Sequence, residues 1–154
     1  MNLKTILTAA AFAAASTAST VALDANAPFT GTVGNYCALE VTQDGVLNVS
    51  ADFETLTSTT GATAQVAKVK ATTSDATGGG FNLSIAQPTD WITEPGNQNT
   101  TFDATFKLGA SGYDANAKPL TAANQTANVH LTATADDGPF LSGDYTAEVV
   151  VTCD

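Results

Sequence analysis

The stretch YTAEVVVTCD, Tyr145–Asp154, decides the fold that the sequence predicts. Apolar and polar side chains alternate along it, as in a strand with one face in a core and the other in solvent. The only other cysteine, Cys37, lies in YCALEV, where apolar residues alternate again. Cys37 and Cys153 are each in phase with core-facing residues, so we expect a disulfide that ties the first body strand to the last. The residues expected to face the core are Cys37, Leu39, Val41, Tyr145, Ala147, Val149, Val151 and Cys153.

Residues 1–22 have the features of a secretory signal peptide. Lys4 supplies a positive start, residues 6–15 are an apolar run, and small residues follow up to Ala22. The apolar run is too short to span a bilayer. We expect cleavage after Ala22, with Ala18 as the nearest alternative. Export places the chain in an oxidising compartment, where a disulfide persists.

The charge of the chain is strongly unbalanced. It has 5 Lys and Arg residues, none of them arginine, against 15 Asp and Glu residues, for a formal net charge of −10. Such a surface repels the phosphates of nucleic acids and anionic lipids. We therefore expect no binding to nucleic acid and none to membranes after signal cleavage, and we interpret the acidity as a means of staying soluble.

Residues 35–154 are expected to form one all-β domain, an antiparallel, immunoglobulin-like β-sandwich. Short alternating segments are separated by turn residues, and helical periodicity is absent after the signal. Asp44–Gly45 between two apolar runs predicts a hairpin. The opposite parity of Val66 and Val69 predicts a bulge. The strands are expected at 36–41, 46–50, 53–57, 63–73, 81–85, 102–108, 127–135 and 145–154.

An arm at residues 23–34 precedes this domain. Its apolar residues fall on one parity, whereas Pro28 cannot donate a ladder hydrogen bond and so favours an edge strand or an extended tail. The simplest interpretation is an ordinary first strand of the sandwich. The residues on the apolar parity are Leu23, Ala25, Ala27, Phe29, Gly31 and Val33.

No arrangement of residues indicates catalysis, and we expect no enzymatic activity, no cofactor and no metal. His130 is the only histidine; its parity places it outward among threonines, where we expect a solvated side chain without catalytic partners. Asp136 with Asp137, and separately Asp114 with Asn116, supply fewer oxygens than a calcium site needs, and we interpret them as turn residues. Trp91 either stacks on a sugar ring or, as a lone tryptophan usually does, closes one end of the core.

The signal peptide, the alternating arm, Cys37, the Thr- and Ala-rich strands and the closing SGDYTAEVVVT segment resemble secreted bacterial fimbrial subunits, including the spore-coat-protein-U-like pilins. In that family the sandwich lacks one strand, which a periplasmic chaperone and then the arm of a neighbouring subunit supply. The resemblance implies that Leu23, Phe29, Gly31 and Val33 belong to a donor strand, in which Gly31 passes a tight spot. Cys153 departs from the family, whose disulfide commonly joins strands closer in sequence, and this leaves a self-contained sandwich open.

The expected function is therefore that of a structural subunit of a surface fibre or coat. Its partners would be other copies or other fibre subunits, with a chaperone and usher, in the periplasm, at the cell surface or in a fimbrium. The alternative is an extracellular module that binds carbohydrate or another ligand through Trp91 and the long loops. A hydrolase is the third hypothesis, because any two aspartates can meet in space.

Overall fold

The computed structural model describes residues 28–154, so the predicted signal peptide and the first part of the arm, with Leu23, lie outside it. The chain divides into two units after Gly31, and the fold is that of the second unit, Thr32–Asp154. Every regular element among the described residues is a β-strand. This confirms the all-β prediction, and no helix among these residues is long and apolar enough to cross a membrane.

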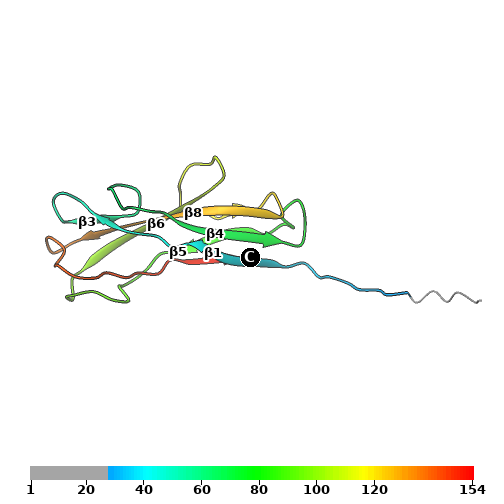
Figure 1. The fold of residues 1–154 in the computed structure, drawn as a ribbon, viewed down its shortest axis with the longest axis horizontal. Helices are drawn as coiled ribbons and strands as arrows, with labels where there is room; N and C mark the ends of the chain where they lie inside the picture. The colour runs from blue at the N-terminus through cyan, green and yellow to red at the C-terminus, as the bar shows by residue number, and fades with distance from the viewer. Residues whose placement is uncertain (1–27) are drawn as a thin grey trace, which may run out of the picture. The chain divides into compact units, whose positions relative to one another are not determined.

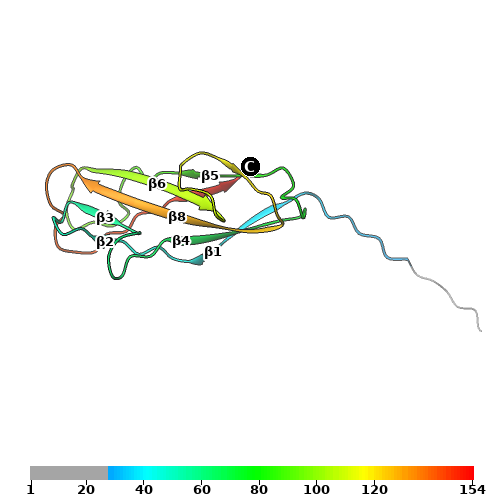
Figure 2. The same ribbon diagram turned by 90° about the horizontal axis from the view of Figure 1, so that it is seen from above.

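Two antiparallel sheets build the domain (Figures 1 and 2). In the larger sheet the strands follow the order β1-β4-β8-β3-β2, and β6 pairs with the other edge of β8. Its strands are β1 (Cys37–Gln43), β2 (Asn48–Val49), β3 (Thr55–Thr57), β4 (Ala67–Thr73), β6 (Thr100–Leu108) and β8 (Asn124–Ala135). The smaller sheet has the order β7-β5-β9, with β5 (Asn82–Ala86), β7 (Lys118–Pro119) and β9 (Val150–Cys153).

β8 is the centre of the larger sheet, and its period-two pattern explains its position. Five alternate residues of β8 are at most 8% exposed, whereas the residues between them are partly or fully exposed. β6 lies alongside β8 in register from Thr100↔Ala135 to Leu108↔Ala127, and it adds Ala104 and Phe106 to the core. The predicted inward faces of both strands are therefore correct. The buried residues of β8 are Ala127, Val129, Leu131, Ala133 and Ala135.

The predicted hairpin at Asp44–Gly45 is wrong. β1 pairs with β4 and β2 with β3, so the chain does not reverse between β1 and β2. Val46 exchanges two backbone hydrogen bonds with Gln65, just before β4, and therefore continues in the direction of β1. The bulge also lies elsewhere: the register shifts between Val41 and Gln43 in β1, and not in the 63–73 segment.

The closing strand is shorter than predicted but keeps its alternation. β9 begins only at Val150, and Thr146 makes an isolated bridge to Thr93. From Tyr145 to Cys153 every second residue is partly buried and the others are exposed. The segment is thus an extended chain with the predicted inward face, of which only the last part is paired in a ladder.

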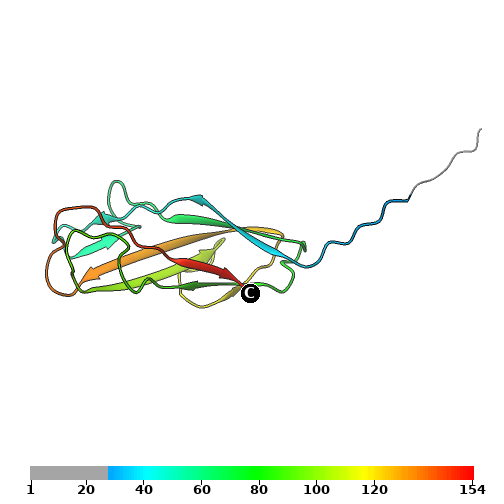
Figure 3. The same ribbon diagram turned by 90° about the horizontal axis from the view of Figure 1, so that it is seen from below.

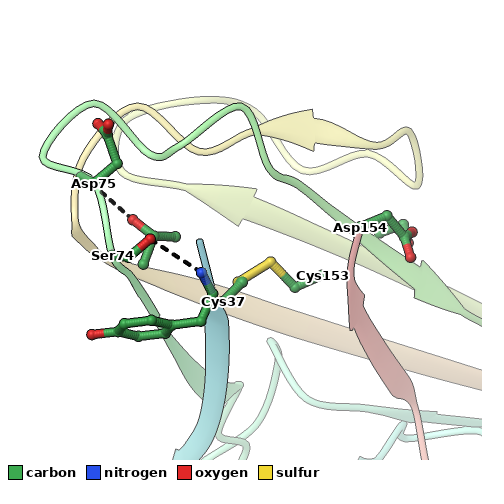
Figure 4. The surroundings of a disulfide bond; sticks show 8 residues. Cys37, Ser74, Asp75, Cys153 and Asp154 are labelled. Atoms are coloured by element: carbon green, nitrogen blue, oxygen red, sulfur yellow. Dashed lines mark hydrogen bonds between the residues drawn. A yellow bond between two sulfur atoms is a disulfide. The ribbon is translucent and has the colours of Figure 1, made fainter. Parts of the chain in front are cut away.

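The predicted disulfide between Cys37 and Cys153 is confirmed (Figure 4). It joins β1 of the larger sheet to β9 of the smaller one, with the two Cα atoms 6.3 Å apart. Both cysteines pack against the main core cluster. Beside the bridge, the Tyr36 N–H donates to Ser74 Oγ, and the Tyr36 carbonyl accepts from the Ser74 N–H, each at 3.1 Å.

We predict that the protein produced in an oxidising compartment has no free thiol and that Cys37→Ser/Cys153→Ser lowers the free energy of unfolding. The bridge spans 116 residues, and closing a loop of this length stabilises by about 4–5 kcal/mol in the chain-entropy model. Thiol titration in denaturant and equilibrium unfolding measure the two effects. Two reactive thiols in protein that was produced in an oxidising compartment and then denatured would contradict the prediction.

Candidate functional site

An apolar groove of about 640 Å³ lies between the larger sheet and the chain segment from Gly143 to Val151. Side chains of β3, β4 and β8 form its floor, the closing segment forms one wall, and β1 with the residues after it forms the other. The floor consists of Leu56, Val69, Val129 and Leu131, and the walls include Val41, Val46, Leu47, Tyr145, Ala147, Val149 and Val151.

The core-facing side of β1 is open to solvent along this groove. Val41 is 62% exposed and Leu39 36% exposed, although both share the parity of Cys37. By comparison, the inward residues of β8 in the same sheet are covered by other residues and are at most 8% exposed. Burying a valine or leucine side chain stabilises a protein by roughly 1.5–3 kcal/mol. A partner that covered these two side chains would therefore stabilise the domain.

Unpaired backbone borders the groove on both sides. Among the described strands, β1 is an edge strand that pairs with β4 alone, and β9 is an edge strand that pairs with β5 alone. Within the described chain, Ala147, Glu148 and Val149 make no backbone hydrogen bond to another element. Such edges are templates for an added strand.

The disulfide marks one end of the groove, since Cys153 follows the wall residue Val151 and is bonded to the start of β1. Figure 3 shows β9 and the beginning of β1 near each other at this end. Asp44 and Gly143 line the opposite end. An extended strand of about 3.3 Å per residue that follows the chain from Gly143 to Val151 would span roughly 30 Å.

Trp91 packs against Tyr145, a residue of the groove wall. Its ring makes edge-on contacts with Phe102, Phe140 and Tyr145, with centroids 4.9–6.0 Å apart. Its Nε1–H donates to Thr100 Oγ1 at 3.0 Å, and the residue is only 8% exposed. Trp91 therefore closes one end of the core, and its ring faces are not offered to a sugar.

Gln98 fixes the position of the chain around Leu141 and Tyr145, a role that the sequence did not predict. Its Oε1 accepts hydrogen bonds from the Leu141 N–H and the Tyr145 hydroxyl, both at 3.1 Å, and its Nε2 donates to the Pro139 carbonyl. The Tyr145 hydroxyl also lies 3.0 Å from the Leu141 carbonyl. One side chain of the 87–99 loop thus holds the segment that leads into the groove wall. No local pattern indicated it, because its partners lie more than 40 residues away.

Ser58 fills a gap at the edge of β8. β4 pairs with this edge up to Val129 and β3 from Thr132 onward. Between them, the Ser58 N–H donates to the Leu131 carbonyl at 3.0 Å, and Ser58 Oγ accepts from the Leu131 N–H at 3.1 Å. Ser58 is 3% exposed and lines the groove. A single serine therefore satisfies both backbone groups of Leu131.

His130 faces outward as predicted, but it is not simply solvated. Nδ1 lies 2.7 Å from Ser58 Oγ, and Nε2 lies 3.0 Å from Thr132 Oγ1. Desolvation lowers the pKa of His130 below its ordinary value of 6.5, against the smaller opposing effect of the Asp103 carboxylate. A neutral ring with its proton on Nε2 accepts a hydrogen bond from the Ser58 hydroxyl at Nδ1 and donates one to Thr132 Oγ1, so both contacts fit the neutral form.

The described part of the arm forms no strand. Phe29 is 95% exposed and Val33 80% exposed, and a Cβ on Gly31 would meet no atom within 4 Å. Residues 28–36 contain no strand, so the described part does not support an ordinary first strand. Leu23 lies outside the described residues.

Among residues 28–154, no group of three or more His, Cys, Asp or Glu side chains is arranged to hold a metal ion. The loop carboxylates have local partners: Asp136 accepts from Thr101 Oγ1, and Asp137 from Asn99 Nδ2. No protein family model, curated protein or solved structure matched this chain.

His130 should make the stability of the domain depend on pH. Because its pKa is lower in the folded state than the unfolded value of about 6.5, its contribution is complete above that pH and is lost as the pH falls toward the folded-state pKa. We predict that the denaturant concentration at the midpoint of unfolding decreases as the pH is lowered from about 7 to about 5. His130→Gln, which keeps hydrogen-bonding groups but does not titrate, should remove this slope; an unchanged slope would contradict the assignment.

Proposed function

We propose that this chain is a structural subunit of a bacterial surface fibre or coat, and that the arm of one copy completes the sandwich of another by adding a strand in the groove. The observation that carries the proposal is the groove itself, where the core-facing Val41 is 62% exposed between two unpaired strand edges. The immunoglobulin-like type of the sandwich, export through a signal peptide and the location at the cell surface belong to the same proposal.

The arm has the chemistry that the groove requires. An added strand must offer apolar side chains at every second position to the floor and hydrogen-bonding backbone to both edges. Leu23 to Val33 alternates in this way, and it is long enough, at about 3.3 Å per residue, to fill a groove of roughly 30 Å. Phe29 is its largest side chain and has the most to gain from burial, about 1.5–3 kcal/mol.

Connectivity gives the arm a direction between copies. The arm joins its own body at Cys37, the disulfide end of the groove. A head-to-tail series forms when the Val33 end of the arm lies at the Gly143 end of the acceptor groove, which makes the arm antiparallel to the closing segment. The opposite direction would bring like ends of two copies together and close them into a pair.

If the arm folded back along its own β1 through the shortest turn, its apolar side chains would point away from the core. Tyr36 is held in an extended pairing with Ser74. A two-residue turn at Gly34–Asn35 would set Val33 opposite Tyr36, which has the outward parity. Val33, Gly31 and Phe29 would then point outward, and the intervening polar residues would point into the core. This favours assembly between copies.

We predict that the intact chain without its signal assembles into oligomers and that Phe29→Asp blocks this assembly. Size-exclusion chromatography with light scattering measures the outcome. Val41→Asp, placed in the acceptor wall at a site that is exposed in the free subunit, should block assembly equally, and its unfolding midpoint should match that of the equally unassembled Phe29→Asp variant.

The matched controls place the same charge on the opposite parity. Thr30→Asp in the arm and Ala38→Asp in the regular part of β1, before the bulge, should still assemble. A stable wild-type monomer whose arm is sensitive to protease would remove the fibre hypothesis. A monomer whose arm is protected would indicate return into its own groove through a longer loop.

A further inference from the structure

Three lysines gather on the outer face of the larger sheet. Lys68 and Lys70 of β4 lie on one side of β8, and Lys107 of β6 lies on the other. The register sets Lys68 and Lys107 opposite the same residue, Asn128, so they lie in one row about 10 Å apart, at roughly 4.8 Å per strand. Lys70 lies two residues along β4 from Lys68 and therefore points to the same side.

These lysines have no ionic partner within the described chain. The one salt bridge among residues 28–154 is between Lys118 and Asp114, and Lys118 is the remaining lysine there. Lys107 is steadied instead by the ring of Tyr113, with Nζ 4.7 Å from its centroid. In a chain with 15 acidic residues, three unpaired cations on one face form a distinct positive surface.

A shallow depression of about 560 Å³ adjoins Lys68 on this face. Its lining contains amides, a hydroxyl, a glycine and a lysine, but no carboxylate. Gln125 Oε1 accepts hydrogen bonds from the Thr121 and Ala122 N–H groups. The amide NH₂ of Gln125 is therefore the group that can donate hydrogen bonds to a ligand. The lining residues are Lys68, Gly109, Asn124, Gln125, Thr126 and Asn128.

We propose that this lysine face, Lys68, Lys70 and Lys107 with the adjoining depression, binds acidic polysaccharide through the carboxylates of its uronate residues. The ammonium groups pair with carboxylates, and the amide and hydroxyl groups of the depression exchange hydrogen bonds with sugar hydroxyls. The site is separate from the groove and from Trp91, and it does not depend on strand addition.

The net charge of the chain favours a sparsely charged anionic polymer over a densely charged one as the ligand of this face. Double-stranded DNA carries one charge per about 1.7 Å, and a chain with a net charge of −10 repels so dense a polyanion at long range. A polyuronate is less densely charged and offers hydroxyls that phosphates lack. Glu40, the register partner of Lys70, borders the face and limits its affinity for any anion.

The experiment uses the full chain without its signal, with polygalacturonate as the probe and dextran as the neutral polysaccharide. We expect affinity electrophoresis to show retardation by polygalacturonate that salt weakens, and none by dextran. The triple variant Lys68→Gln/Lys70→Gln/Lys107→Gln should bind about tenfold more weakly or worse, equivalent to about 1.4 kcal/mol. Glu40→Gln should bind more tightly.

A second triple variant controls for net charge. Thr60→Asp/Ala62→Asp/Ser142→Asp makes the same change in charge at exposed loop positions outside the lysine face, and it should retain most of the binding. Circular dichroism checks that both variants fold. Equal loss in the two triple variants, unchanged binding in the lysine variant, or tighter binding to duplex DNA or to an acidic protein than to polygalacturonate would each overturn the proposal.

Discussion

The Cys37–Cys153 disulfide is the constraint on which the open side of this sandwich depends. It fastens the edge strand of one sheet to the edge strand of the other at a single end. Away from it, Val41 and the closing segment border a groove, and among residues 28–154 neither edge has a backbone partner on that side. The bridge therefore keeps two edges facing each other that no ladder joins, and it keeps the groove in shape without filling it.

The closing segment owes its extended form to side chains more than to a ladder. Trp91 and Gln98 hold its beginning, and β5 with the disulfide holds its end. Ala147 to Val149, between these anchors, keep their inward parity without backbone pairing. A segment fixed at both ends and unpaired in the middle is well suited to accept a neighbouring strand, because few native hydrogen bonds must break first.

Period-two patterning predicted what depends on one strand at a time. It located β6 and β8, their buried faces and the phase of both cysteines correctly. It failed where pairing partners decide: Asp44–Gly45 was expected to form a hairpin, but Val46 pairs with Gln65 instead. Ser58 could have been noticed, since it shares the inward parity of Leu56, and a serine there needs a polar partner. Gln98 carried no such signal, and Trp91 permitted two interpretations until its neighbours were known.

The groove and the lysine face lie on different surfaces of the domain, and this separation has a physical consequence. The groove opens at the β1 and β9 edges, whereas the lysines point outward from the middle of the larger sheet. A strand added at the groove leaves that outer face uncovered. Each of these partly exposed lysines contributes little alone, because its charge is hydrated and screened by salt. Repetition along an assembly would convert weak single contacts into avidity, so a structural subunit gains most from a binding face that its own assembly does not cover.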